Sequence, residues 1–305
     1  MKKIAEKIKV LKERHNAIIL AHTYQRPEVQ DVADFVGDSL DLSLKAKDNV
    51  ADIIVFCGVK FMAETAKIIS PHKKVLLAEL DAGCPMAEMI TADELRELKL
   101  KYSNYKVVCY VNSTAEVKAL SDICCTSSNA VKVVNSIPQD QGVIFVPDAN
   151  LGSYVQRTLK RKNMILWQGH CYVHAFVMEE DVLNLKKQYP KAVVFAHPEC
   201  TDHVLKHANY ILSTSEMIKK VAELNDGEFI IITEQGIIYP LQKKYPQKKF
   251  YSLDKSVCLN MKKTTINSVL NSLELMQYNI EVPKNVMENA KKAVFNMLEL
   301  QNNGH

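Results

Sequence analysis

Three of the eight cysteines in this sequence recur at a constant interval. They are Cys84, Cys171 and Cys258, and each is 87 residues from the next. No two cysteines have the CxxC spacing of a zinc or redox motif, so a metal site would be assembled from distant parts of the chain. A single cysteine at a strand end is usually a small buried apolar residue. We interpret the other five in that way: Cys57, Cys109, Cys124, Cys125 and Cys200.

Three thiolates can serve two kinds of inorganic centre. A structural zinc ion normally takes four protein ligands, whereas a [4Fe–4S] cluster held by three cysteines leaves one iron open to substrate. An open iron is a Lewis acid that binds a carboxylate or hydroxyl group and assists its departure. The spacing alone leaves zinc, a cluster and simple burial of the three cysteines as alternatives.

Two further sets of residues recur at intervals of 88 and 87 residues. The first set ends three apolar runs and consists of His22, Tyr110 and His197. The second set opens three segments with helical spacing and consists of Ser39, Ser127 and Thr214. Free N–H groups at a helix N-terminus favour carboxylate or phosphate groups. The second set therefore predicts a dicarboxylate or phosphate ligand, with simple helix N-capping as the alternative.

The secondary structure follows the same period. Each interval reads β-α-β-α-β-α-β or close to it, and its short, wholly apolar strands are typical of a parallel sheet covered on both faces. We predict an α/β fold of three αβα sandwich domains around a pseudo-threefold axis, formed by residues 1–83, 84–171 and 172–263. Helices in 264–305 are predicted to complete the first domain. Strand carboxyl ends that face the axis would bring the repeated residues into one central cavity.

Composition and charge exclude several function classes. The chain has 305 residues, 47% of them apolar and 24% charged, which is typical of a globular protein. A dispersed net charge of +4 is too small to indicate a nucleic-acid surface. No apolar stretch approaches the ~18 residues of a membrane span, and the N-terminal segment lacks the apolar core of a signal peptide. We predict a cytoplasmic protein with a small-molecule ligand, reduced cysteines, and no nucleic-acid or membrane partner.

An ordered series of motifs runs through nearly the whole chain. It comprises AHTYQRPEVQDVADFVGDSLDLS, FCGVKFMAETAKI, GCPMAEMIT, CYVNSTAEVKALSDICCTSSNA, PDANLGSYV, GHCYVH, HPEC and STSEMI. In this order the motifs resemble those of the quinolinate synthase family, the A-type enzymes of de novo NAD biosynthesis. The resemblance implies three α/β sandwich domains about a pseudo-threefold axis, as the repeat does.

The resemblance also implies a cofactor and a reaction. Cys84 in GCPMAEM, Cys171 in GHCYVH and Cys258 in SVCLNMKK match the family's ligands of a [4Fe–4S] cluster, one per chain, with one iron not held by the protein. The implied reaction condenses iminosuccinate with dihydroxyacetone phosphate to give quinolinate, phosphate and water. Iminosuccinate is supplied by an aspartate-oxidising enzyme, which implies functional coupling to that enzyme.

Further residues match the family's substrate-contacting positions. They are His22, Ser39, Tyr110, Asn112, Ser127, His197, Glu199 and Thr214, and Tyr24 matches a tyrosine of the active site. The hydroxyl set would anchor carboxylates, Tyr110 and Asn112 would donate hydrogen bonds, and the two histidines would orient the three-carbon substrate or move its protons. Glu199 is expected to be the general base. The predicted catalytic residues are Glu199, Tyr24, Tyr110, His22 and His197.

A different class of protein would use the same three thiolates. In a non-catalytic sensor of dicarboxylates, His170 or His174 would close the coordination sphere of a zinc ion or an iron–sulfur centre. The two hypotheses differ in metal content, because iron with labile sulfide indicates the enzyme and zinc indicates the sensor.

Overall fold

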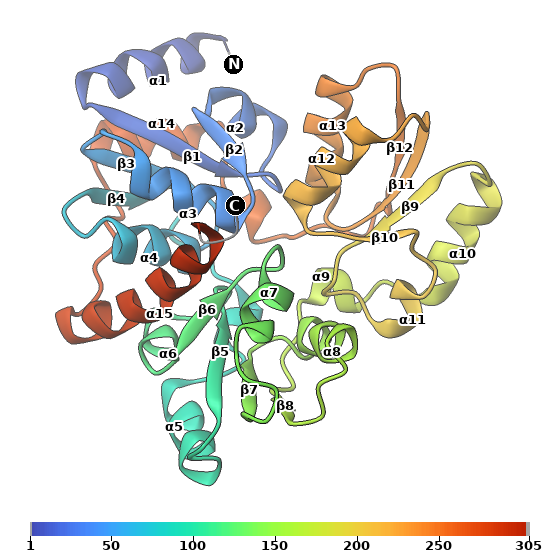
Figure 1. Ribbon diagram of the computed structural model, residues 1–305. Helices are drawn as coiled ribbons and strands as arrows, with labels where there is room; N and C mark the ends of the chain where they lie inside the picture. The colour runs from blue at the N-terminus through green and yellow to red at the C-terminus, as the bar shows by residue number, and fades with distance from the viewer. Residues whose placement is uncertain (1, 303–305) are drawn as a thin grey trace.

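A computed structural model describes residues 2–302, and it contains three four-stranded sheets arranged around a common centre (Figure 1). The strand orders are β2-β1-β3-β4, β6-β5-β7-β8 and β10-β9-β11-β12, and all pairing is parallel. We call these the first, second and third sheet. Their common order and direction confirm the predicted α/β fold of three sandwiches.

The elements follow the predicted alternation of strands and helices. The first sheet is built from α1 (Lys2–Arg14), β1 (Ala17–His22), α2 (Pro27–Val32), β2 (Phe35–Gly37), α3 (Ser39–Asp48), β3 (Ile53–Cys57), α4 (Lys60–Ile69) and β4 (Lys74–Leu77). The second follows with η1 (Pro85–Glu88), α5 (Ala92–Lys101), β5 (Lys106–Tyr110), α6 (Ala115–Ala119), β6 (Ile123–Cys125), α7 (Ala130–Asn135), β7 (Val143–Val146), α8 (Ala149–Thr158) and β8 (Met164–Leu166). The third follows with α9 (Tyr172–Ala175), α10 (Glu179–Gln188), β9 (Val193–Ala196), α11 (Asp202–Leu205), β10 (Tyr210–Ile211), α12 (Thr214–Glu223), β11 (Glu228–Ile232), η2 (Gln235–Ile237), α13 (Ile238–Lys244) and β12 (Lys249–Tyr251). The chain ends with η3 (Met261–Lys263), α14 (Ile266–Leu275) and α15 (Lys284–Asn302).

Apolar strand sequences explain why the sheets are covered on both faces. All four residues of β7 are buried, and the last four residues of β1, β3 and β11 are buried as well. In each sheet the first and third strands in chain order lie side by side at the middle. The connection after the first strand leads to one edge of the sheet, and the connection after the third strand leads to the other edge. The crevice at their carboxyl ends is where ligands bind in open parallel sheets. The fold therefore supplies three such crevices.

The two C-terminal helices pack on different parts of the molecule. α14 lies against α1, α2 and β3, whereas α15 lies against α6 and β6 of the second sheet as well as α4 of the first. The domain boundaries stay a prediction, and the assignment of 264–305 to the first domain describes α14 better than α15. Residue 1 and residues 303–305 lie outside the described part. Within residues 2–302, no helix combines the length and the apolar composition needed to cross a membrane.

The core of the second sheet should carry much of the stability of its domain. Phe145 in β7 is completely buried, so Phe145→Ala is expected to lower the free energy of unfolding by about 3–5 kcal/mol. Leu100→Ala is the control, because the Leu100 side chain in α5 is 81% exposed and should contribute little. Urea denaturation of the two variants measures the difference, and equal midpoints would contradict this account of the core.

Candidate active site

One cavity lies where the three sheets meet. It is lined by all twelve site residues singled out from the sequence: His22, Tyr24, Ser39, Cys84, Tyr110, Asn112, Ser127, Cys171, His197, Glu199, Thr214 and Cys258. These residues come from all three sheets and from positions up to 236 residues apart. The structure thus brings the predicted residues together, while their individual roles stay predictions.

The three first strands of the sheets end at equivalent positions in this cavity. His22 and Tyr110 are the last residues of β1 and β5, and His197 directly follows β9. Two residues further along each chain segment are Tyr24, Asn112 and Glu199, which also line the cavity. The topology therefore repeats three times, while the side chains at equivalent positions differ. The result is a polar site in which each sheet offers different chemistry.

Both histidines of the site have a backbone N–H group close to Nδ1. The backbone N–H of Tyr24 donates to Nδ1 of His22 at 3.1 Å, and the N–H of Glu199 donates to Nδ1 of His197 at 3.4 Å. An accepting Nδ1 leaves the ring proton on Nε2. Burial, aided by Lys262, lowers the pKa of His22 to about 3, and burial with the nearby His174 lowers that of His197. His22 is thus a neutral Nε2–H donor, whereas Nδ1 of His197 also lies 3.2 Å from the carboxylate of Glu199, which favours a proton on Nδ1.

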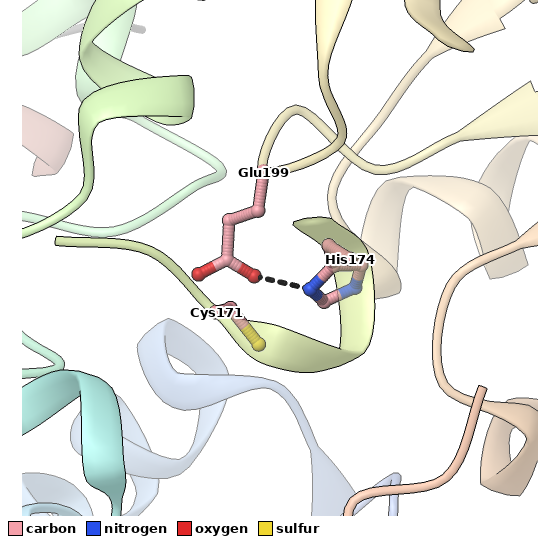
Figure 2. A group of neighbouring side chains, drawn as sticks. All are labelled: Cys171, His174 and Glu199. Atoms are coloured by element: carbon pink, nitrogen blue, oxygen red, sulfur yellow. Dashed lines mark ion pairs between the residues drawn. The ribbon is translucent and has the colours of Figure 1, made fainter. Parts of the chain in front are cut away.

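Glu199 reaches from the loop after β9 towards α9, where it meets His174 and Cys171 (Figure 2). Its Oε2 lies 2.8 Å from Nδ1 of His174 and 3.2 Å from Nδ1 of His197. Burial alone would raise the pKa of Glu199, but the two histidine rings outweigh burial and lower it. Glu199 is therefore an ionised carboxylate in the wall of the cavity, as a proton acceptor requires.

Beyond the contact of Glu199 with His174, a chain of hydrogen bonds continues from His174 to Tyr24 and Thr214. Nε2 of His174 lies 2.8 Å from Oγ1 of Thr233, and the hydroxyl of Tyr24 lies 2.7 Å from both Thr233 and Thr214. Burial raises the pKa of the Tyr24 phenol well above its ordinary value, so it keeps its proton. We call Glu199, His174, Thr233, Tyr24 and Thr214 the buried relay.

Sequence reasoning missed two members of the buried relay. His174 was considered only as a fourth metal ligand, and Thr233 was not singled out at all. Thr233 directly follows β11, so its place at the carboxyl end of a buried strand was a usable signal. His174 lies three residues after Cys171, one helical turn along α9, which brings it to the same cavity.

Tyr24→Phe tests the buried relay. The change removes the hydroxyl shared by Thr214 and Thr233, so the free energy of unfolding should fall by about 1–3 kcal/mol. Turnover should fall by ~10²-fold if the hydroxyl also passes a proton. Tyr278→Phe is the control, because Tyr278 lies on the surface away from the cavity. Unchanged turnover of Tyr24→Phe would show that the relay has no role in proton transfer.

The helix N-termini at the cavity differ from the sequence expectation. Asp38 and Ser213 are the N-caps of α3 and α12, so Ser39 and Thr214 are the first helical residues rather than the caps. Ser127 lies in a turn three residues before α7 instead of at its start. The N-cap interpretation of these hydroxyl residues is therefore wrong. Their hydroxyl groups line the cavity and remain available to a ligand.

The caps of α3 and α12 are joined to the second sheet. The hydroxyl of Ser128 donates to Oδ2 of Asp38 at 2.9 Å and also contacts the hydroxyl of Ser213 at 2.8 Å. One short side chain therefore links segments that belong to all three sheets. This contact holds the N-termini of two helices from different sheets close together.

The three regularly spaced cysteines differ from the other five in exposure. Cys84, Cys171 and Cys258 are partly exposed on the cavity, whereas the remaining cysteines are buried. Among residues 2–302, three donor atoms come within 4.8 Å of one another only in the group Cys171, His174 and Glu199. At least one pair of the three sulfurs is thus more than 4.8 Å apart. A single zinc ion with Zn–S bonds of ~2.3 Å would need closer sulfurs, so the three thiols as placed do not form a single-ion site.

Comparison with known proteins agrees with this site. The family model described as "Quinolinate synthetase A protein" matches residues 6–299. Quinolinate synthase from Caldicellulosiruptor saccharolyticus is 51% identical over 301 residues, covering 98% of this chain and 99% of the relative. Quinolinate synthase 2 from Methanosarcina acetivorans is 53% identical, covering 97% and 96%, and quinolinate synthase from Clostridium acetobutylicum is 50% identical, covering 97% and 98%. The chain therefore belongs to the quinolinate synthetase A protein family and is an enzyme of the quinolinate synthase type.

Proposed function

We propose that the chain condenses iminosuccinate with dihydroxyacetone phosphate to form quinolinate, phosphate and, for the atoms to balance, two molecules of water. The observation that carries the proposal is the single cavity in which residues from three sheets bring together three partly exposed thiols, two neutral histidines and an ionised carboxylate.

The residues present fit a [4Fe–4S] cluster, one per chain. Cys84, Cys171 and Cys258 would hold it, because all three thiols face one cavity and are too widely spaced to share a single ion. Thiolates are the ligands that such clusters prefer. When bound, the cluster supplies one iron without a protein ligand, a Lewis acid that assists the loss of a hydroxyl group as water.

The polar residues of the cavity would bind and orient the substrates. Hydroxyl groups of Ser39, Ser127 and Thr214 anchor carboxylates, the Nε2–H group of His22 donates to an oxygen of the three-carbon substrate, and His197 orients the same substrate. Oδ1 of Asn112 is buried and has no hydrogen-bond partner within residues 2–302, so it is free for a substrate N–H or hydroxyl group. Burial raises the pKa of Tyr110, which stays a neutral donor.

Glu199 is the general base in this proposal. Its ionised Oε2 can take a proton from substrate carbon or nitrogen during the imine–enamine steps. His174 lies at 2.8 Å from that oxygen and at 2.8 Å from Thr233, so the buried relay can return the proton through Tyr24. The relay thus connects proton removal at one wall of the cavity with proton delivery at the other.

The sensor hypothesis is less compatible with the geometry. Nε2 of His174 is hydrogen-bonded to Thr233, and its Nδ1 lies 2.8 Å from Oε2 of Glu199, so a metal ion at this ring would compete with the contact between His174 and Glu199. His170 is not among the residues that line the cavity. The neighbourhood of Cys171, His174 and Glu199 is instead explained by the contact between the general base and the relay.

Two further parts of the proposal concern the setting of the reaction. A cytoplasmic location agrees with eight free cysteines. Iminosuccinate is a reactive imine, so an aspartate-oxidising enzyme that produces it nearby is the partner expected for this activity.

An anaerobic assay tests the proposed function. The protein is purified without oxygen, its iron and labile sulfide are measured, and iminosuccinate is generated in place from aspartate in the presence of dihydroxyacetone phosphate. About four irons per chain and the appearance of pyridine dicarboxylate are expected. A colourless zinc protein that forms no product would reject the proposal in favour of the sensor.

A further inference from the structure

Equivalent positions at the three sheets carry different residues. The residue two places after the third strand is the helix N-cap in every case: Val59 for α4, Asp148 for α8 and Glu234 for η2. Val59 makes no side-chain cap, whereas both acidic residues do. Val59 and Glu234 line the cavity, and Asp148 and Glu234 are completely buried.

Each acidic cap binds a second N–H group besides that of its helix. Oδ1 of Asp148 accepts the N–H of Leu151 at 2.7 Å, and Oδ2 accepts the N–H of Cys171 at 3.1 Å. Oε2 of Glu234 accepts the N–H of Gly236 at 2.6 Å, and Oε1 accepts the N–H of Cys258 at 3.1 Å. Two of the three cysteines are thus bound through their backbone by a buried carboxyl group.

A backbone hydrogen bond between the N-cap segment and the cysteine segment is the same at all three sheets. The residue after each N-cap donates its N–H to the carbonyl two residues before the cysteine. The pairs are Lys60 with Ala82 at 2.8 Å, Ala149 with Gly169 at 2.8 Å, and Gln235 with Ser256 at 2.9 Å. Only the acidic cap is missing at the first sheet. Within residues 2–302 the structure gives no hydrogen bond from the N–H of Cys84.

We propose that Asp148 and Glu234 are positioning residues that fix the backbone N–H groups of Cys171 and Cys258 for the cluster, while Cys84 has the shared backbone contact without a carboxyl group at its N–H. The inference rests on the cluster in the proposed function. Groups that orient metal ligands from behind change metal affinity by 10- to 100-fold. Hydrogen bonds to the sulfurs of a cluster raise its reduction potential. The two acidic caps bind the N–H groups of Cys171 and Cys258, so these groups do not donate to the sulfurs.

The charge balance of the two caps also differs. Nζ of Lys262 lies 3.0 Å from Oε1 of Glu234, and it also donates to the backbone carbonyl of Tyr24. The described residues provide no cation within ion-pair distance of Asp148. Asp148 is therefore the better position for a test, because its substitution leaves no lysine without a partner.

Asp148→Asn in the holoenzyme is the central test. Asparagine keeps the volume but has one accepting oxygen, so it cannot accept from both Leu151 and Cys171. Iron release to a chelator should be ~10-fold faster than in the wild type, and the midpoint potential of the cluster should shift upward. Thr114→Ala is the matched control, since it removes the N-cap hydrogen bond of α6 without touching a cysteine. This control should keep the wild-type potential and release rate.

The outcomes separate this inference from the proposed function. If the wild type binds no iron, the proposed function fails. If the wild type binds about four irons and Asp148→Asn matches it in potential and release rate, only this inference is overturned. Thermal unfolding of the apoprotein shows whether Asp148→Asn has folded. If it has not folded, Glu234→Gln is measured instead, because Glu234 binds the N–H of Cys258. The midpoint potential should again shift upward and iron release should again be faster, and wild-type values of both would overturn the inference.

Discussion

Replacing Cys171 by alanine is expected to abolish iron binding and product formation together. A cluster held by three thiolates loses a third of its protein ligands, and the Lewis acid at the cavity is lost with it. Loss of several kcal/mol of transition-state stabilisation lowers turnover by at least ~10³-fold. Iron analysis and the anaerobic assay measure both effects on the same sample.

Cys57→Ala is the matched control for this substitution. Cys57 is completely buried in the first sheet and does not line the cavity. It should keep full iron content and activity, with a loss of about 1 kcal/mol in unfolding free energy from the small cavity created. A Cys171→Ala protein that retains four irons and normal turnover would remove Cys171 from the ligand set.

Glu199→Gln is expected to lower turnover by ~10²- to 10⁴-fold while leaving the iron content unchanged. Glutamine fills the same space beside His174 but cannot take up a proton, so substrate binding should change less than turnover. The pKa of Glu199 is lowered by the two histidines, so in the wild type the acid limb of the turnover profile should lie below the ordinary carboxyl range. Kinetics at several pH values test both statements.

Glu223→Gln provides the comparison for loss of a carboxylate. Glu223 ends α12 on the surface and pairs with Lys220, so its contribution to stability is small and it has no contact with the cavity. Wild-type kinetics are expected. Near-normal turnover of Glu199→Gln, with an intact cluster, would assign proton removal to another group.

The sequence predicted those parts of the molecule that repeat. The interval of 87 residues between cysteines and the three recurring apolar runs identified the three parallel sheets. The rules for connecting parallel strands leave few alternative topologies for such a pattern. Carboxyl ends of parallel strands carry the ligand-binding residues, so His22, Tyr110 and His197 could be placed in one cavity before any coordinates.

What the sequence did not reveal depends on contacts between units that do not repeat. Thr233 joins the site through His174 and Tyr24, and Ser128 joins it through two helix caps of other sheets. No periodic pattern marks such partners. The helical pattern after residue 264 predicted helices that complete the first domain, but α15 packs on the second sheet as well as the first.

The position of iron in the central cavity is the most direct test of this account. Crystals grown without oxygen and measured at the iron absorption edge should show one cluster bonded to the sulfurs of Cys84, Cys171 and Cys258, with one iron lacking a protein ligand. Iron bonded to His174 in a closed coordination sphere, or three sulfurs that share no cluster in active protein, would contradict it.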